Sequence, residues 1–92
     1  MKFIWSEWKA KENLKKHGVG FPEAITVFDD PLSILMTDDV HSYSEERLIL
    51  MGQSNGGRIL VVVHTQEEDM ARRLSVREAT TRERKQYEEG EI

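Results

Sequence analysis

The side chains best suited to chemistry are arginines in the last third of the chain. Arg73 and Arg77 flank Ser75 in a segment of alternating polarity, so an extended strand would place all three on one face. Guanidinium groups in such a row suit phosphate, because each offers several N–H donors in a planar fork. The structural alternative is an ion pair between Arg77 and a neighbouring carboxylate.

Two other segments carry candidate groups. Arg47 follows Glu46 at the start of an apolar run, so the two could serve as a phosphate anchor and a base, or could pair with each other. His64 comes at the end of the most apolar run in the chain. A side chain there can emerge from a sheet into a groove. The alternative is a histidine held by a hydrogen bond at the end of a strand.

Metal and cofactor chemistry find less support. There is no cysteine, and His17, His41 and His64 are too far apart in sequence for a short metal-ligand spacing. The Asp38-Asp39 pair with His41 could bind a cation, but a polar turn is the commoner explanation. Asn55-Gly56-Gly57 lacks the Lys-Ser/Thr and helix that follow a phosphate-binding loop. We therefore predict neither a metal nor a cofactor.

The first elements that must position these groups are a short strand and a helix. Residues 3–5 are expected to form an opening strand. Ser6 is a plausible N-cap for a helix that runs to about His17, where Gly18 would end it with a positive φ angle. The inward stripe of this helix is predicted to consist of Ala10, Leu14 and His17.

Two more helices are predicted, one before the strands that carry the candidate residues and one after them. A second helix should begin at Pro22, because apolar residues recur at helical spacing there, namely Phe21, Ala24, Ile25 and Phe28. Thr80 and Glu83 form a capping box for a C-terminal helix that runs to about Glu89. That helix has almost no apolar face beyond Tyr87, so it is expected to be loosely held or to rest on a partner.

The middle of the chain changes to strand periodicity. Strands are predicted at residues 32–37, 46–53, 58–65 and 70–78, and Asn55-Gly56 between two apolar runs indicates a tight hairpin. Met70, Leu74 and Val76 should point to one side of the last strand. The predicted class is α+β: two N-terminal helices packed on a four-stranded antiparallel sheet, with a short C-terminal helix, forming a single domain over residues 1–92.

Composition limits the class of protein. With 38% hydrophobic and 33% charged residues the chain is expected to be globular, with no segment long enough to cross a membrane and a cytoplasmic location by default. The net charge of −4 argues against a protein that coats nucleic acid by bulk attraction. Cations nevertheless gather in two places. These are the first helix, with Lys9, Lys11, Lys15 and Lys16, and the 14 residues that hold Arg72, Arg73, Arg77, Arg82, Arg84 and Lys85.

Nearly the whole chain resembles the BrnT toxins of bacterial toxin–antitoxin systems. The resemblance is carried by segments in one order: 13–19 with Phe21, 24–31, His41-Ser42, 45–47, Gly52, 61–65, Ser75, Arg77, Ala79-Thr80, Arg82-Glu83-Arg84 and Tyr87-Glu88. It implies a RelE-like α+β fold and an endoribonuclease that halts translation. It further implies neutralisation by a BrnA-like antitoxin with a ribbon-helix-helix part, DNA contact only through that antitoxin, and toxin self-association within the complex.

For such a ribonuclease, metal-free cleavage needs a base for the 2′-hydroxyl proton, cations for the phosphorane, and a donor for the leaving oxygen. Our candidates for these catalytic roles are Arg77, His64, Arg47 and Glu46. The candidates for binding RNA phosphates are Lys16, Arg73 and Arg82. Trp5 and Trp8 could stack on bases, although packing in a core or a dimer interface is the more common role.

Two positions depart from the family pattern. Glu78 stands where the family usually has a basic residue after the arginine, and Arg73 replaces a typically aliphatic one. Together with the acidic net charge, Glu78 favours an alternative: an inactive domain that serves only as an antitoxin-binding platform and co-repressor. Retention of Arg47, His64 and Arg77 favours the active toxin.

Overall fold

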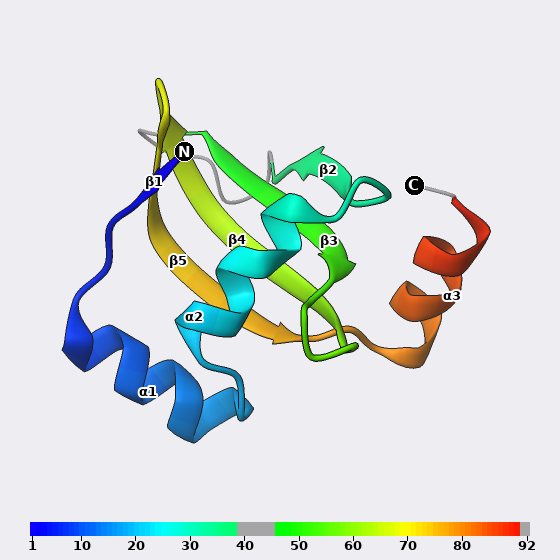
Figure 1. Ribbon diagram of the computed structural model, residues 1–92, viewed down its shortest axis with the longest axis horizontal. Helices are drawn as coiled ribbons and strands as arrows, with labels where there is room; N and C mark the ends of the chain where they lie inside the picture. The colour runs from blue at the N-terminus through cyan, green and yellow to red at the C-terminus, as the bar shows by residue number, and fades with distance from the viewer. Residues whose placement is uncertain (39–45, 91–92) are drawn as a thin grey trace.

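A five-stranded mixed sheet forms the centre of the computed structural model, which describes residues 1–38 and 46–90 (Figure 1). The strand order is β1-β5-β4-β3-β2. The strands are β1 (Lys2–Phe3), β2 (Ile34–Thr37), β3 (Arg47–Gln53), β4 (Ile59–Glu67) and β5 (Met70–Glu78). The predicted α+β class is therefore confirmed, and four strands lie close to their expected bounds.

The predicted sheet of four antiparallel strands is wrong in one respect, which is the opening strand. β1 pairs parallel to β5, with Lys2 opposite Met70 and Phe3 opposite Ala71, and so adds a fifth strand. Phe3 packs edge-on against Phe28 at 4.9 Å between ring centroids, which anchors this short strand to the core. Beyond Ala71, β5 has no neighbouring strand on this side among the described residues.

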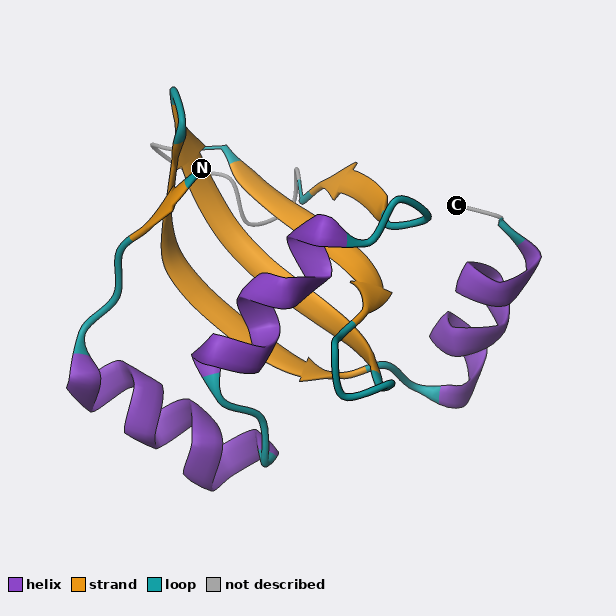
Figure 2. Ribbon diagram, in the orientation of Figure 1, coloured by secondary structure: helices purple, strands orange, loops and turns teal. Residues whose placement is uncertain are grey.

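Helices cover one face of the sheet (Figure 2). They are α1 (Glu7–His17), α2 (Phe21–Ala24) and the 3₁₀ helix η1 (Ile25–Asp29). The predicted second helix thus exists but tightens to a 3₁₀ helix after one turn. The main core lies between these helices and the sheet and contains Val19, Phe21, Ala24, Val27, Leu50, Leu60, Val62, Leu74 and Val76. At Gly52 a Cβ atom would come within 3.0 Å of the Val27 side chain, so glycine lets η1 approach β3.

The predicted ends of α1 are confirmed, but its predicted inward stripe is partly wrong. Ser6 accepts a hydrogen bond from the Lys9 amide, and Gly18 ends the helix at φ 69°. Leu14, however, is 54% exposed, and Asn13 is buried in its place. The Asn13 Nδ2 donates to the Val19 and Val76 carbonyls at 2.9 Å each, and its Oδ1 accepts from the Val76 amide at 3.1 Å.

Asn13 thereby takes the place of a neighbouring strand. The backbone amide and carbonyl of Val76 face the side of β5 along which β1 pairs, but β1 ends opposite Ala71 and does not reach them. Both groups are paired by one side-chain amide, so the backbone of this open strand edge is satisfied where α1 crosses it. This contact also fixes the rotation of α1 about its own axis.

The opposite side of the sheet, which we call the second face, follows from the pairing register. Val61, Val63 and Thr65 of β4 point to it, together with their partners Met51, Ile49 and Arg47 on β3 and Arg77, Ser75 and Arg72 on β5. A second, smaller apolar cluster lies here, formed by Ile34, Met51, Val61 and Ala79.

The last helix, α3 (Thr81–Glu89), begins with the predicted capping box between Thr80 and Glu83, which is confirmed. None of its residues is buried, as expected of its polar sequence. Its Tyr87 packs against the cluster on the second face, and the Tyr87 hydroxyl donates to the Asp30 carboxylate at 2.5 Å. Among residues 1–38 and 46–90, no helix is long and apolar enough to span a membrane.

Candidate functional site

Arg77 lies on the second face at the end of β5, and it is bound to a carboxylate. Its two terminal nitrogens donate to the two oxygens of Glu83 at 2.7 and 2.9 Å, a bidentate pair. The structural alternative considered for Arg77 is therefore present. The Arg77 side chain remains 44% exposed, so it can be reached from solvent.

Glu83 serves two structures at once. Besides Arg77, it accepts a hydrogen bond from the Thr80 amide in the capping box. The bidentate hydrogen bonds from Arg77 outweigh partial burial and, with the Thr80 amide, lower the pKa of Glu83 from 4.5 to about 2. Glu83 is therefore ionised throughout the physiological range, and it neutralises the charge of Arg77 at every such pH.

The unusual Glu78 contacts Arg77 only through its backbone carbonyl, which accepts a hydrogen bond from Arg77 at 3.2 Å, and its carboxylate points elsewhere. Glu78 pairs with Leu60 and so lies on the helix-covered face, whereas Arg77 pairs with Val61 on the second face. The Glu78 carboxylate lies 4.0 Å from the Arg58 guanidinium instead. The departure from the family pattern at this position therefore leaves the charge beside Arg77 unchanged, and Glu83 is the carboxylate that matters there.

A second cationic group lies at the other end of the same face. Arg47 pairs with Thr65 across β3 and β4, and Thr65 pairs with Arg72 across β4 and β5. The Cα atoms of the two arginines are therefore about 10 Å apart, two strand spacings. This row is displaced from Arg77 by four residues along β4, or about 14 Å. Arg72 was not among the predicted site residues.

A β-bulge explains why Arg72 takes the position expected for Arg73. Two residues of β5, Arg73 and Leu74, lie opposite His64 alone, and Arg73 has φ 53°, in the left-handed region. Ser75 and Arg77 share a face as predicted, but the extra residue removes Arg73 from that alternation. Arg73 is exposed beside the row rather than part of it.

The expectation that His64 emerges into a groove is wrong. His64 points to the helix-covered face, is 1% exposed, and packs edge-on against Phe28 at 5.0 Å. Neither ring nitrogen has a hydrogen-bond partner of ordinary geometry within the described residues. Burial lowers the pKa of His64, only partly opposed by the nearby Gln66 side chain and Val62 backbone. Its position does not support a role in cleavage.

The buried His64 leads to a prediction about acid stability. The pKa of His64 lies below 6.5 in the folded state. As the pH falls below 6.5, the imidazole is therefore protonated in the unfolded chain before it is protonated in the folded protein. Stability is therefore fully present above about pH 6.5 and falls below it, by at most ~1.4 kcal/mol per pH unit.

Chemical unfolding between pH 7 and 5 measures this slope, and His64→Leu should flatten it. Glu83 and the other carboxylates of lowered pKa contribute equally in both proteins, so they do not affect the comparison. Equal pH dependence of the two proteins in this window would contradict the assignment.

The remaining predicted residues are scattered. Glu46 is exposed and directly precedes β3, beside Arg47. Arg82 is exposed in the first turn of α3, next to Glu83. Lys16 is exposed on α1 and therefore belongs to the side of the sheet opposite the arginines. The candidate cation site at 38–39 with His41 lies partly outside the described residues, and the described part holds no cluster of metal-ligating side chains.

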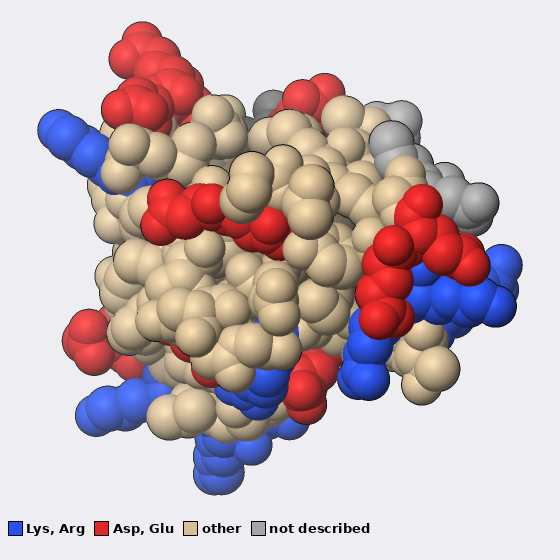
Figure 3. All heavy atoms as spheres, turned by 45° about the vertical axis from the view of Figure 1, so that its right-hand side comes forward, with Lys and Arg blue, Asp and Glu red and all other residues tan. Residues whose placement is uncertain are grey.

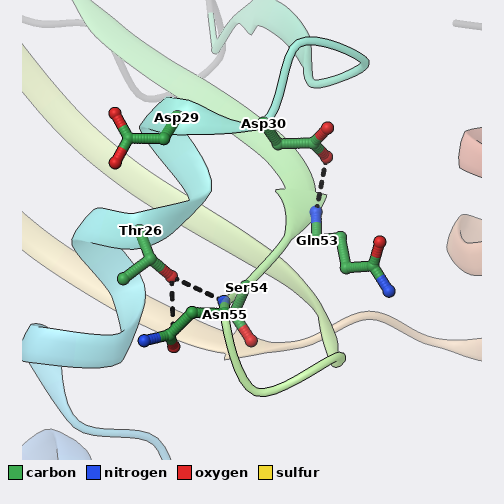
Figure 4. A pocket seen from close by; sticks show the side chains of 6 residues that line it. All are labelled: Thr26, Asp29, Asp30, Gln53, Ser54 and Asn55. Atoms are coloured by element: carbon green, nitrogen blue, oxygen red, sulfur yellow. Dashed lines mark hydrogen bonds between the residues drawn. The ribbon is translucent and has the colours of Figure 1, made fainter.

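A polar pocket of about 510 Å³ beside the Asn-Gly hairpin is unsuited to phosphate (Figure 4). Two of its lining residues, Asp29 and Asp30, are acidic. Burial raises the pKa of Asp30, but hydrogen bonds from Gln53, Tyr87 and Leu32 outweigh it and lower the pKa overall. Thr26 accepts a hydrogen bond from the Asn55 amide at 2.9 Å. These contacts tie η1 to the hairpin, and the negative charge would repel RNA.

Charges of both signs are mixed on the surface around α3. In the view that brings this side forward, Lys and Arg side chains at the right lie directly beside Asp and Glu, and others gather at the bottom (Figure 3). Positive charge around α3 is therefore interleaved with negative charge. On the second face, the three arginines Arg47, Arg72 and Arg77 suit the binding of a few phosphates and the stabilisation of charge that develops on one of them.

Two kinds of known protein resemble the chain, a family and a solved structure. Residues 5–83 match the family described as the ribonuclease toxin, BrnT, of type II toxin–antitoxin systems. A crystal structure of the Brucella abortus ribonuclease toxin, BrnT, is similar to the chain, with 25% sequence identity and a TM-score of 0.66, over 88% of this chain and 99% of that one. Curated protein sequences give no match. Because the family match covers most of its length, the chain belongs to the BrnT family of ribonuclease toxins.

Proposed function

We propose that the chain is an endoribonuclease toxin that cleaves RNA on the second face, without a metal ion, and so inhibits translation in the cytoplasm. The observation that carries the proposal is the placement of Arg47, Arg72 and Arg77 on one face of the sheet. Membership of a ribonuclease toxin family supports the same reading. A RelE-like fold is part of the proposal.

The arginines supply electrostatic stabilisation. The ribose 2′-oxygen attacks the adjacent phosphorus, the bond from phosphorus to the 5′-oxygen breaks, and a 2′,3′-cyclic phosphate forms. Arg77 binds the phosphorane as its negative charge develops, while Arg47 and Arg72 hold flanking phosphates. Water accepts the 2′-hydroxyl proton and protonates the leaving 5′-oxygen, because Glu46, beside Arg47, lies about 14 Å or more from Arg77 along the sheet, out of reach of the phosphate that Arg77 binds. Arg73 and Arg82 add positive charge around the site.

The proposed partner is a BrnA-like antitoxin with a ribbon-helix-helix part. Toxin would self-associate within that complex, and DNA would be contacted through the antitoxin alone. Membership of a type II toxin–antitoxin family supports an antitoxin partner. Co-expression of the neighbouring gene with a ribbon-helix-helix pattern should restore growth if this assignment is correct.

One observation favours the second candidate function, an inactive co-repressor. Arg77 is already neutralised by Glu83, so phosphate must compete with a bidentate carboxylate for it. Competition of this kind weakens binding but does not prevent it, because the pair is partly exposed and such pairs contribute little stability. We therefore retain the active toxin as the proposed function.

Expression of the chain alone should arrest growth, and the purified protein should cleave single-stranded RNA in excess EDTA to cyclic-phosphate ends. The Arg47→Gln/Arg72→Gln double variant should lower the cleavage rate by about tenfold or more, since two charge-assisted contacts are lost. Arg84→Gln, which removes a charge from α3, serves as the matched control. Normal growth with soluble protein would contradict the toxin and favour the co-repressor.

A further inference from the structure

Trp8 is the most exposed large hydrophobic residue described, at 73%. It lies in the first turn of α1 and extends into solvent. Trp5, three residues earlier, instead packs edge-on against Phe21 at 5.6 Å and is half-buried. Leaving an indole ring in water forgoes the large apolar burial that tryptophan usually supplies. Packing in the core explains Trp5 but not Trp8.

The orientation of Trp8 is fixed by the other side of α1. Asn13 bonds to Val19 and Val76, and Ala10 is half-buried against the core. Helical geometry then places Trp8 on the outward side, because it is offset from Asn13 by about 140° around the axis. The helix cannot turn to bury the ring without breaking three hydrogen bonds to the backbone.

Two lysines lie beside the exposed ring. Lys11 and Lys15 follow Trp8 by three and seven residues and so share its face of the helix, whereas Lys16 lies on the flank, nearer to Asn13. Glu12 is the one carboxylate on this outward side. The helix as a whole carries four lysines against two glutamates, a net charge of +2 on a chain whose net charge is −4. None of these lysines forms an ion pair with a described residue.

We propose that this outward face of α1 (Trp8, Lys11 and Lys15) is a second contact for single-stranded RNA, outside the cleavage site. Trp8 stacks on one base, and the lysines bind the phosphates on either side of it. Stacking on an aromatic ring within a cationic surface is how proteins hold single strands with little sequence preference. This inference rests on the proposed function, since it concerns the same RNA.

RNA fits the surface better than a protein partner does. Lysine is depleted at the centre of protein–protein interfaces, because its ammonium group is costly to dehydrate. Here lysines flank the aromatic ring closely, and no ion pair with a described residue neutralises them. A polyanion supplies both the negative charge and the flat aromatic groups that the surface can bind.

The strand β5 connects the two contacts. Val76 is bonded to Asn13 of α1, and the next residue, Arg77, points to the second face. α1 covers this edge of β5 in place of a neighbouring strand, so an RNA strand bound on the outward side of α1 would pass over the helix and around the edge to reach the second face. RNA bound at Trp8 would thereby be held close to the cleavage site without occupying it.

Binding of a fluorescein-labelled, 2′-O-methylated 12-nucleotide oligouridylate tests the proposal, because this probe cannot be cleaved. Trp8→Ala should weaken its affinity about five- to hundredfold, and Trp8→Phe should restore most of it. Lys15→Gln should lower the slope of log K against log salt by about 0.7, and Lys2→Gln, on β1, is the control that leaves the slope unchanged. Unchanged thermal unfolding of Trp8→Ala verifies that the fold is intact.

Each outcome decides a separate claim. Equal affinity of wild type and Trp8→Ala, or no binding by the wild type, overturns the RNA contact. If the protein still cleaves RNA in either of these cases, the proposed function stands and only the contact at Trp8 is rejected. Binding that depends on Trp8 in a protein that cleaves nothing supports the contact and removes the ribonuclease. Unchanged RNA affinity with weakened self-association of Trp8→Ala in sedimentation would reassign the face to a second copy of the chain.

Discussion

Replacing Asn13 by alanine is expected to lower the free energy of unfolding by about 3 kcal/mol or more. The substitution removes three hydrogen bonds and leaves the Val76 amide, the Val76 carbonyl and the Val19 carbonyl without their partner. Each buried polar group left unpaired costs about 1–3 kcal/mol. Asn13 itself is only 7% exposed.

Thermal unfolding measures the effect directly. For a domain of this size each kcal/mol lowers Tm by about 4–8 °C, so Asn13→Ala should unfold at least about 12 °C below the wild type. Leu14→Ala removes a larger apolar side chain from the next position, but this side chain is 54% exposed and the loss should stay below about 1 kcal/mol. Similar Tm values for the two variants would contradict the role of Asn13.

The contrast between Asn13 and Leu14 shows where sequence reasoning about the fold reaches its limit. Helical spacing of apolar residues selects Leu14, and no local pattern indicates that an asparagine will satisfy a strand 63 residues away. Local signals succeeded where the cause is local. The N-cap Ser6 and the capping box of Thr80 are hydrogen bonds within one turn, and both are present as predicted.

The candidate site was predicted less well than the fold, for two physical reasons. β4 is buried on both faces, so its apolar run carries no information about which side His64 occupies. The bulge at Arg73 then shifts the alternation of β5, and a non-glycine residue with a positive φ angle has no sequence signal. Arg72 could have been found only by allowing for such a bulge. Arg77 was identified correctly as lying on one face with Ser75.

Arg77→Gln is expected to lower the rate of RNA cleavage by about 100- to 1000-fold, the usual effect of removing a donor that stabilises developing charge. The same substitution should abolish growth arrest. Arg77 is bound to Glu83, so removing the guanidinium also leaves that carboxylate without its main partner, and it would repel phosphate. Part of the loss therefore comes from Glu83.

Glu83→Gln separates the two contributions. Glutamine retains the hydrogen bond to the Thr80 amide in the capping box but no longer neutralises Arg77. We expect tighter RNA binding, by severalfold, in this variant. Glu89→Gln removes the same charge from the exposed end of α3 and is the matched control. Because the pKa of Glu83 is about 2, lowering the pH from 8 to 5 should not reproduce the gain.

The double variant Arg77→Gln/Glu83→Gln decides whether Glu83 acts through Arg77. If it does, the gain from Glu83→Gln should be much smaller once the arginine is gone, because residues in direct contact are not additive. If Glu83→Gln tightens RNA binding equally with and without Arg77, then Glu83 repels RNA directly and does not act by neutralising Arg77. Glu83 would then be a general acidic feature of α3, and the cleavage site would have to be sought at Arg47 and Arg72.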